Sequence, residues 1–268
     1  MAVINQPFQG QLGSILINEM ENNYASLTIF SAFAKNSGVL RLKSTLEQHK
    51  ANGGTITAFI GIDLDGTSYE ALLNLYSLCD DLYVIHSENF STIFHSKIYL
   101  LEKNDKAWCA VGSNNLTSGG LWSNFESCNI EEYSLPREQT ALDSIHEIVQ
   151  RYKDVNYECS TRISSIDDID ELLVANYITK EVSQRIENNS RQTNQRARQR
   201  RTHLFGTEHV SIPTLITITS PRPNTRESVP THEIELAVEL PDDNHQTRRP
   251  AFTNEQFWFE MRKSTGGS

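Results

Sequence analysis

The sequence predicts an α/β fold, a mixed sheet sandwiched by helices, with a small β-rich C-terminal part. Segments of helical and of strand-like periodicity alternate through the first half of the chain, which is typical of a sheet covered by helices. The strand-like segment 55–62 is apolar at nearly every position, as strands buried in mixed or parallel sheets are. From residue 205 strand-like signals predominate. A chain of 268 residues is long enough for one large domain with a smaller appendage.

The first six elements follow from local patterns. Apolar residues recur at helical spacing after Leu12, and another helical segment ends at Gly53 and Gly54, a helix-ending signal. Between the helical segments lie runs rich in β-branched and aromatic residues, which favour strands. We therefore expect helices at 12–24, 40–52 and 68–79, and strands at 25–33, 55–62 and 81–86.

Polar residues suited to phosphate chemistry begin at His95-Ser96-Lys97, directly before the strand-like run 98–101. Residues two apart in a strand point to the same face, so His95 and Lys97 should project together. A polar break at 103–106 suits a hairpin connection. The imidazole can attack or transfer a proton, and the ammonium can neutralise phosphate charge.

A second strand-like run, 107–111, ends in Gly112-Ser113-Asn114-Asn115. By the same alternation Ser113 and Asn115 share a face, where a hydroxyl and a carboxamide can hydrogen-bond phosphoryl oxygens. Gly112 lets the backbone come close to a ligand, which makes it a candidate substrate-binding position. A further short strand is expected at 125–130.

Glu126, near the start of that strand, is a candidate to accept a proton from one ring nitrogen of His95. Such a bond would fix the tautomer and leave the other nitrogen as nucleophile. The competing interpretation is a solvated strand face followed by an ordinary turn. His86 ends the expected strand 81–86 and could lie near the site, although a lone histidine there is more often an ordinary surface or hydrogen-bonded residue.

The pattern His95-x-Lys97 followed by Gly112-Ser113-x-Asn115 resembles the signature of the phospholipase D superfamily. Many members place an Asp a few residues after the Lys, whereas this chain has Glu102 and a longer connection. With Asn115 twenty residues and Glu126 thirty-one residues after His95, the pattern looks most like the metal-independent restriction endonucleases of that superfamily. The resemblance covers roughly residues 20 to 155.

This resemblance implies a phospholipase D-like fold and a DNA endonuclease of restriction type that needs no metal or cofactor and cuts phosphodiesters through a covalent phosphohistidine. His95 would attack phosphorus, Lys97 and Asn115 would bind the non-bridging oxygens, Ser113 would support them, and Glu126 would orient His95. Superfamily members with two H-x-K motifs in one chain take the nucleophile from one motif and the acid that protonates the leaving oxygen from the other. Because this chain has only one, we expect a homodimer through the catalytic domain, with one composite site.

Three alternatives stand beside this interpretation. A metal-dependent nuclease with a (D/E)-x-K motif is disfavoured, because no lysine of the chain follows an Asp or Glu by two residues. A phospholipase or phosphatidyl-transferase of the same superfamily is disfavoured by the lack of an amphipathic stretch that combines Lys or Arg with Trp or Phe. A nucleic-acid-binding module whose site no longer turns over stays open.

Beyond the motif, the segment 137–152 predicts an amphipathic helix with Leu142, Ile145, Ile148 and Val149 inward. The segment 166–187 begins with acidic residues and then shows helical spacing through Ile178. We expect a catalytic domain at 1–160, a helical and Arg-rich linker at 161–204, and a small β-rich region at 205–268 with a disordered tail.

An arginine run marks the linker. Between residues 187 and 208 the chain carries no acidic side chain but five arginines, which are candidates for contacts with the DNA backbone. A solvated linker is an equally open interpretation. The candidate residues are Arg191, Arg196, Arg198, Arg200 and Arg201.

Net charge and cysteine content limit the binding partners and the cellular location that we expect. The net charge of -10 argues against general attraction to nucleic acid but permits a locally basic groove. Four scattered cysteines form no zinc-type pattern and are expected as buried free thiols. No signal peptide or membrane-length apolar stretch is evident, so we expect a soluble cytoplasmic protein that binds DNA and no membrane. The C-terminal region is available for an additional protein partner.

Overall fold

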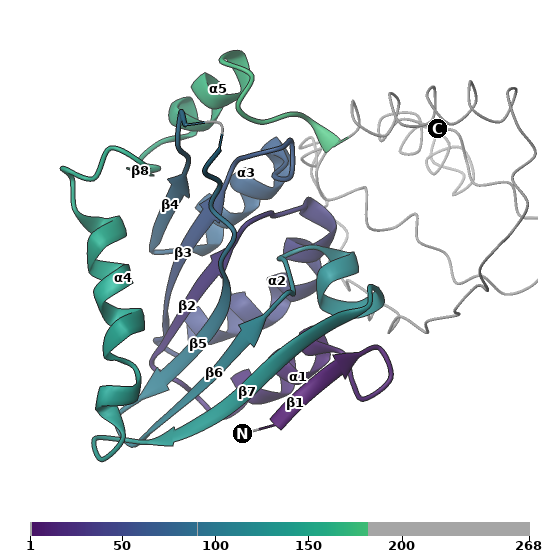
Figure 1. The fold of residues 1–268 in the computed structure, drawn as a ribbon, viewed down its shortest axis with the longest axis vertical. Helices are drawn as coiled ribbons and strands as arrows, with labels where there is room; N and C mark the ends of the chain where they lie inside the picture. Colours follow the sequence, from purple (N-terminus) through teal and green to yellow (C-terminus); the bar gives the residue numbers. More distant parts are fainter. Residues whose placement is uncertain (1, 90, 182–268) are drawn as a thin grey trace, which may run out of the picture. The chain divides into compact units, whose positions relative to one another are not determined.

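The computed structural model describes residues 2–89 and 91–181. Their centre is an eight-stranded mixed sheet in the order β1-β7-β6-β5-β2-β3-β4-β8 (Figure 1). The strands are β1 (Ala2–Gln6), β2 (Ser26–Ser31), β3 (Thr55–Gly61), β4 (Asp81–Ile85), β5 (Lys97–Lys103), β6 (Lys106–Gly112), β7 (Glu126–Ser134) and β8 (Ser160–Arg162). The helices are α1 (Leu12–Met20), α2 (Asn36–Ala51), α3 (Tyr69–Leu78), α4 (Asp143–Lys153) and α5 (Ile166–Val174).

Strand direction determines which strand ends meet. β2, β3 and β4 are parallel, β5 is antiparallel to β2, and β6 is antiparallel to β5. β7 is antiparallel to β6, and β1 to β7. Consequently β2, β3, β4 and β6 end at one edge of the sheet, where β5 and β7 begin. We call this the carboxyl edge.

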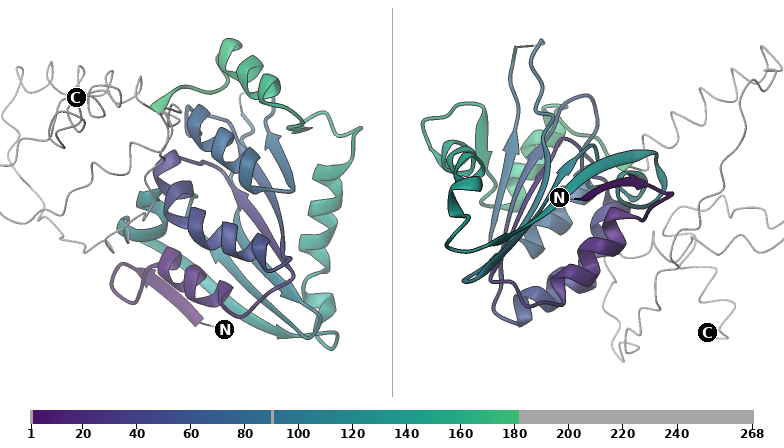
Figure 2. Two further views of the ribbon diagram at one scale, coloured as in Figure 1. Left: turned by 180° about the vertical axis from the view of Figure 1, so that it is seen from behind. Right: turned by 60° about the horizontal axis from the view of Figure 1, so that its bottom comes forward.

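Helices cover both faces of the sheet, as Figures 1 and 2 show. On one face α1, α2 and α3 pack against apolar side chains of the strands, among them Leu27, Ile29 and Tyr99. On the other face α4 covers a second cluster that contains Phe30, Phe59 and Phe94. Alternation along β2 places Ile29 and Phe30 in different clusters, as the pleat of a strand buried on both faces requires.

The predicted mixed sheet between helices is confirmed, and each of the first six predicted elements is present. The predicted inward residues of α4 also contact the core. That helix begins at Asp143 rather than at residue 137, because residues 139–141 form a 3₁₀ turn that inserts Leu142 into the core. The prediction of a helix that continues through Ile178 is wrong. α5 ends at Val174, where Asn176 adopts a left-handed φ of 63°, a common helix-ending conformation of Asn.

Two strands were not predicted. β1 pairs with β7, and β8 pairs with β4, so both lie at the sides of the sheet. Beyond β8, α5 contacts α3, and Thr179 bridges to Ser68. The predicted Arg-rich part of the linker and the β-rich region at 205–268 lie outside the described residues.

All four cysteines are free, as predicted, but the predicted burial is confirmed only for Cys109 and Cys128, since Cys79 and Cys159 are half-buried. Burial raises the pKa of the Cys109 thiol to about 12 and that of Cys128 to about 11. Among the helices of residues 2–89 and 91–181, none is both long and apolar enough to cross a bilayer.

Candidate active site

All five predicted catalytic residues lie at the carboxyl edge. His95 lies two residues before Lys97, which is the first residue of β5. Ser113 and Asn115 follow the end of β6, and Glu126 is the first residue of β7. Segments that are separated in sequence are thereby placed next to one another, since β5, β6 and β7 are neighbours in the sheet.

His95 and Lys97 are in direct contact. The Lys97 ammonium donates to the His95 carbonyl oxygen over 2.8 Å, and its Nζ lies 2.6 Å from Nδ1 and 3.1 Å from Nε2 of the His95 ring. An ammonium can only donate, so the ring nitrogen that faces it accepts. The Phe33 ring packs against the imidazole at an interplanar angle of 82°, with ring centroids 6.0 Å apart. His95 is exposed, whereas Lys97 is only 5% exposed.

Burial of Lys97 has an electrostatic consequence. Removing the ammonium from water lowers its pKa below the ordinary lysine value, and the negative charge of Glu126 raises it by a smaller amount. Glu126 is therefore near enough to act on Lys97 electrostatically. A bound phosphate at this position would supply a second negative charge to the same ammonium.

Glu126 forms its hydrogen bonds with neighbours other than His95. The Ser113 hydroxyl donates to Oε2 of Glu126, and the Asn124 side chain donates to Oε1 over 3.2 Å. Ser113 also accepts the backbone N–H of Ser127 over 3.1 Å. The expected bond between Glu126 and His95 is not among the hydrogen bonds of the described residues. Glu126 thus orients the hydroxyl of Ser113 in this structure.

Asn115 is oriented by the loop after β2. Its Oδ1 accepts the backbone N–H of Phe33 over 3.2 Å, so Nδ2 is the end of the carboxamide that can donate to a phosphoryl oxygen. Ser31 supports the same junction, because its hydroxyl donates to the Phe33 carbonyl and accepts the Leu116 N–H. Ser31 and Phe33 were not predicted as part of the site.

The glycine at position 112 is required by strand packing. A Cβ there would lie 2.3 Å from the carbonyl oxygen of Ser127 and 2.6 Å from Cα of Cys128. β6 and β7 could not approach one another at this point with any other residue. The close approach that explains Gly112 is therefore with β7.

Glu102 occupies the far end of β5, where its Oε1 lies 3.0 Å from Nε2 of His146 on α4. Glu102 thus lies away from the carboxyl edge. His86, by contrast, does lie at that edge, and its Nδ1 is 2.7 Å from Oδ1 of Asp63. Asp63 had no sequence signal beyond being a polar residue after a strand.

Within the described parts of the chain, no group of three or more His, Cys, Asp and Glu side chains is arranged to hold a metal ion. The predicted substrate-binding arginines, from Arg191 to Arg201, lie outside these parts.

Comparison with known proteins identifies the family to which the chain belongs. A model described as the NgoFVII restriction endonuclease N-terminal PLD domain matches residues 11–168, which is more than half of the chain. The chain belongs to this family. It is therefore a phosphodiesterase, a nuclease of the phospholipase D superfamily, and the resemblance inferred from its motif is confirmed.

Solved structures with similar folds include Nuc, a phospholipase D family member from Salmonella typhimurium, at 18% identity and a TM-score of 0.43, covering 61% of this chain and 97% of Nuc. NucT from Helicobacter pylori matches at 12% identity and a TM-score of 0.36, covering 56% of this chain and 94% of NucT. Phosphatidylserine synthase from Haemophilus influenzae matches at 12% identity and a TM-score of 0.43, covering 73% of this chain and 46% of the synthase. No curated protein sequence gives a significant match.

Proposed function

We propose that this family member is a metal-independent DNA endonuclease of restriction type that acts through a covalent phosphohistidine in a homodimeric site. The observation that carries the proposal is the pair formed by the exposed imidazole of His95 and the buried ammonium of Lys97, in direct contact at the carboxyl edge. The pair places a nucleophile beside a cation that can bind the phosphate it attacks.

In the first step, a ring nitrogen of His95 attacks phosphorus and the bond from phosphorus to one sugar oxygen breaks. The leaving oxygen takes a proton from a second histidine. In the second step, the second histidine takes a proton from water, the water oxygen attacks phosphorus, the phosphorus–nitrogen bond breaks, and both histidines are regenerated. Lys97 and the Nδ2 end of Asn115 stabilise the non-bridging oxygens of the phosphate. These donors are already in place where negative charge develops on those oxygens during the reaction.

Ser113 and Glu126 assist these steps. The Ser113 hydroxyl is held by Glu126, which places it beside the phosphate site after β6. The carboxylate of Glu126 stabilises the positive charge of Lys97 and of His95 while the imidazole is protonated or phosphorylated. In this proposal Glu126 acts on the histidine electrostatically and orients it when substrate is bound.

The second histidine comes from a second copy of the chain. One part of the sheet surface, which we call the β1–β7 patch, consists of Val3, Phe8, Val111 and Phe125. These side chains are 45–66% exposed, and the rings of Phe8 and Phe125 stack with centroids 5.6 Å apart. Val3 and Val111 both lie opposite Asn129 in the strand register, so they share one row of the sheet.

The β1–β7 patch suits contact between identical subunits. Its members are uncharged, and at a two-fold axis the same groups meet, so a charged patch would repel its own copy. Among the described residues, α4 contacts β4 and β8 and packs near Tyr133 of β7, away from the end of β7 at which Phe125 lies (Figure 1). Phe125 directly precedes Glu126, so an axis near this patch would bring two carboxyl edges together.

We further assign contacts with the DNA backbone to Arg191, Arg196, Arg198, Arg200 and Arg201. Their support is compositional: five positive charges within eleven residues of a chain whose net charge is negative. We also propose that residues 205–268, which the sequence predicts to be β-rich, recognise DNA sequence or an additional protein.

The decisive experiment incubates labelled plasmid and labelled phospholipid vesicles with the protein in excess EDTA. The proposal expects cleavage of plasmid and not of lipid, and no cleavage by His95→Ala. Activity that disappears with EDTA and returns with Mg²⁺ or Mn²⁺ would contradict the mechanism. Quenching with alkaline denaturant, which preserves a phosphorus–nitrogen bond, should trap labelled DNA on wild-type protein and none on His95→Ala.

A further inference from the structure

Asp63 is a buried carboxylate at the carboxyl edge that takes no part in the proposed chemistry. Its side chain is 6% exposed and lies just beyond the end of β3. Oδ2 accepts the backbone N–H of Phe94 over 3.2 Å, and Oδ1 lies 2.7 Å from Nδ1 of His86. Both carboxylate oxygens are therefore committed, one to a backbone group and one to an imidazole.

The backbone bond matters because Phe94 directly precedes His95. The ring of Phe94 is buried in the aromatic cluster beneath α4 and meets the ring of Tyr152 edge-on, with centroids 5.6 Å apart. Regular pairing of β5 with β2 begins at Lys97, opposite Ser31. His95 and Ser96 thus lie between two fixed points, the anchored Phe94 and the first paired residue of β5.

His86 in turn holds Asp63. A buried carboxylate is costly unless it is paired and hydrogen-bonded, and His86 provides this partner. The His86 ring is itself fixed, because it meets the ring of Tyr177 edge-on at 5.0 Å and its Nε2 lies 3.7 Å from Oε1 of Glu88. Glu88 also accepts a hydrogen bond from the Tyr177 hydroxyl.

We propose that Asp63 and His86 are positioning residues for His95. They act through the Phe94 N–H, which fixes the backbone from which the His95 imidazole projects. The inference rests on the proposed nucleophilic role of His95 but concerns a contact that does not touch substrate. A shift of about 1 Å in a reacting group can cost on the order of 100-fold in rate, so loss of this anchor should be visible in catalysis.

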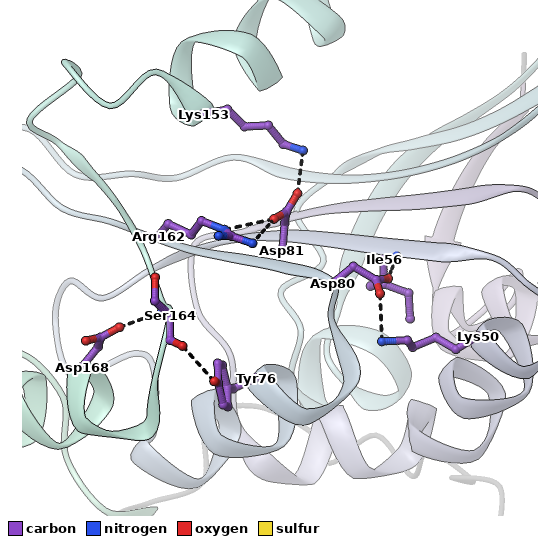
Figure 3. Close-up of polar contacts among 9 residues, drawn as sticks. All are labelled: Lys50, Ile56, Tyr76, Asp80, Asp81, Lys153, Arg162, Ser164 and Asp168. Carbon is purple, nitrogen blue, oxygen red and sulfur yellow. Dashed lines mark hydrogen bonds and ion pairs between the residues drawn. The ribbon is translucent and has the colours of Figure 1, made fainter.

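The chain offers a matched control at the opposite edge of the sheet, where Figure 3 shows Asp80 between Ile56 and Lys50. Asp80 accepts the Ile56 backbone N–H over 2.8 Å through Oδ2, and its Oδ1 lies 3.0 Å from the Lys50 ammonium. Asp80→Ala thus removes the same two kinds of interaction as Asp63→Ala, far from His95.

The experiment measures single-turnover cleavage at saturating DNA, DNA affinity and the free energy of unfolding. We expect Asp63→Ala to lower the cleavage rate by about 10- to 100-fold with DNA affinity changed less than about twofold. Asp63→Asn should recover most of the rate, because its Oδ1 still accepts from Phe94 and its Nδ2 can donate to His86. Asp80→Ala should cleave at the wild-type rate even if it is less stable.

A second measurement does not depend on cleavage. The imidazole NMR signal of His95, assigned by its loss in His95→Ala, should shift in Asp63→Ala and His86→Ala but not in Asp80→Ala. A folded Asp63→Ala protein with wild-type rate and unshifted His95 signal would overturn the inference, as would an equal loss of rate in Asp80→Ala. If wild-type protein does not cleave DNA, the proposed function fails, and the NMR signal still tests the positioning role.

Discussion

Glu126 holds the hydroxyl of Ser113, and this bond joins the start of β7 to the loop after β6. The carboxylate also raises the pKa of the buried Lys97 ammonium, against the larger lowering by burial. One side chain therefore connects two of the groups proposed to bind phosphate. Its contribution should come from its charge and its position together, because Ser113 needs an acceptor and Lys97 needs a negative neighbour.

Glu126→Gln tests this. We expect a fall in cleavage rate of about 10- to 1,000-fold with a small change in DNA affinity, since the amide keeps a partner for Ser113 but loses the charge that stabilises the protonated site. Glu131→Gln is the control, because Glu131 lies on the same strand and accepts a hydrogen bond from the Tyr133 hydroxyl over 2.5 Å. An unchanged rate for Glu126→Gln would remove Glu126 from the mechanism.

The lowered pKa of Lys97 predicts how the cleavage rate depends on pH. Burial lowers its pKa below the ordinary value of 10.5, so its charge is lost at a lower pH than that of an exposed lysine. Cleavage that depends on this ammonium should fall as pH rises through the lowered pKa. A pH–rate profile whose alkaline limb lies at or above 10.5 would contradict the assignment.

The same shift affects stability with a definite sign. Below the lowered pKa both folded and unfolded states carry the proton, and burying the charge costs free energy. Between the lowered pKa and 10.5 the unfolded state binds more protons, so folding stability rises with pH. Lys97→Met should therefore abolish cleavage without lowering the free energy of unfolding at pH 7. Denaturant unfolding of both proteins at several pH values measures this.

Local sequence patterns were sufficient to predict much of the fold and part of the candidate site. The alternation of side chains in a strand was sufficient to place His95 beside Lys97, because that contact needs only two residues of one segment. Similarly, helical spacing identified α1, α2 and α3 since each buries a continuous apolar stripe. β8 has three residues and depends on pairing with β4, so its own sequence contains almost no signal.

The interactions that the sequence analysis did not predict depend on the order of the strands in the sheet. Phe33 meets Asn115 because β2 and β6 flank β5, and no local pattern specifies this arrangement. Asp63 meets Phe94 for a similar reason, since β3 lies two places from β5 in the sheet. Glu126 was expected against His95 from strand position alone. Its bond to Ser113 reflects the adjacency of β6 and β7, which offers a nearer hydroxyl.

Asp81 provides a stability prediction at the edge opposite the site. Figure 3 shows its carboxylate between Lys153 and Arg162, with the Lys153 Nζ 3.0 Å and the Arg162 Nη2 2.8 Å from its two oxygens. Burial alone would raise the pKa of Asp81, but hydrogen bonds and positive charge from the two partners outweigh it and lower the pKa below 3.8.

A lowered carboxylate pKa contributes stability above the ordinary value of 3.8, and this contribution is lost as pH falls through the lowered pKa. These groups are partly exposed, so each pair should contribute only about 0.2–1 kcal/mol. Asp81→Asn should lower the free energy of unfolding at pH 7 by about 0.5–2 kcal/mol, and the difference should shrink in acid. Its cleavage rate should equal that of wild type, because the site lies at the other edge.

The arginine run predicts a change in salt dependence. If Arg191, Arg196, Arg198, Arg200 and Arg201 bind phosphates, replacing them with Gln should weaken DNA binding. The plot of log affinity against log salt should also flatten, by about one unit for each phosphate that is no longer neutralised. Single-turnover cleavage at saturating DNA should be little changed. Equal affinity and equal slope would identify the segment as a linker that does not touch DNA.

The proposed homodimer is tested by a charged substitution in the β1–β7 patch. Phe125→Asp would place two carboxylates near one another across the proposed two-fold axis. Phe125 is 66% exposed, so the isolated subunit should keep its fold. We expect the mass in solution to fall from dimer to monomer, and cleavage to be lost with it because each subunit then lacks the second histidine.

Val155→Asp is the control for this charge, since Val155 is 96% exposed and lies after α4, away from the β1–β7 patch. Sedimentation and cleavage should be measured on the same samples across dilution. A wild-type monomer with full specific activity would contradict the composite site. A Phe125→Asp protein that remains dimeric but binds DNA more weakly would instead assign the stacked rings of Phe8 and Phe125 to DNA binding, where exposed rings can stack on bases.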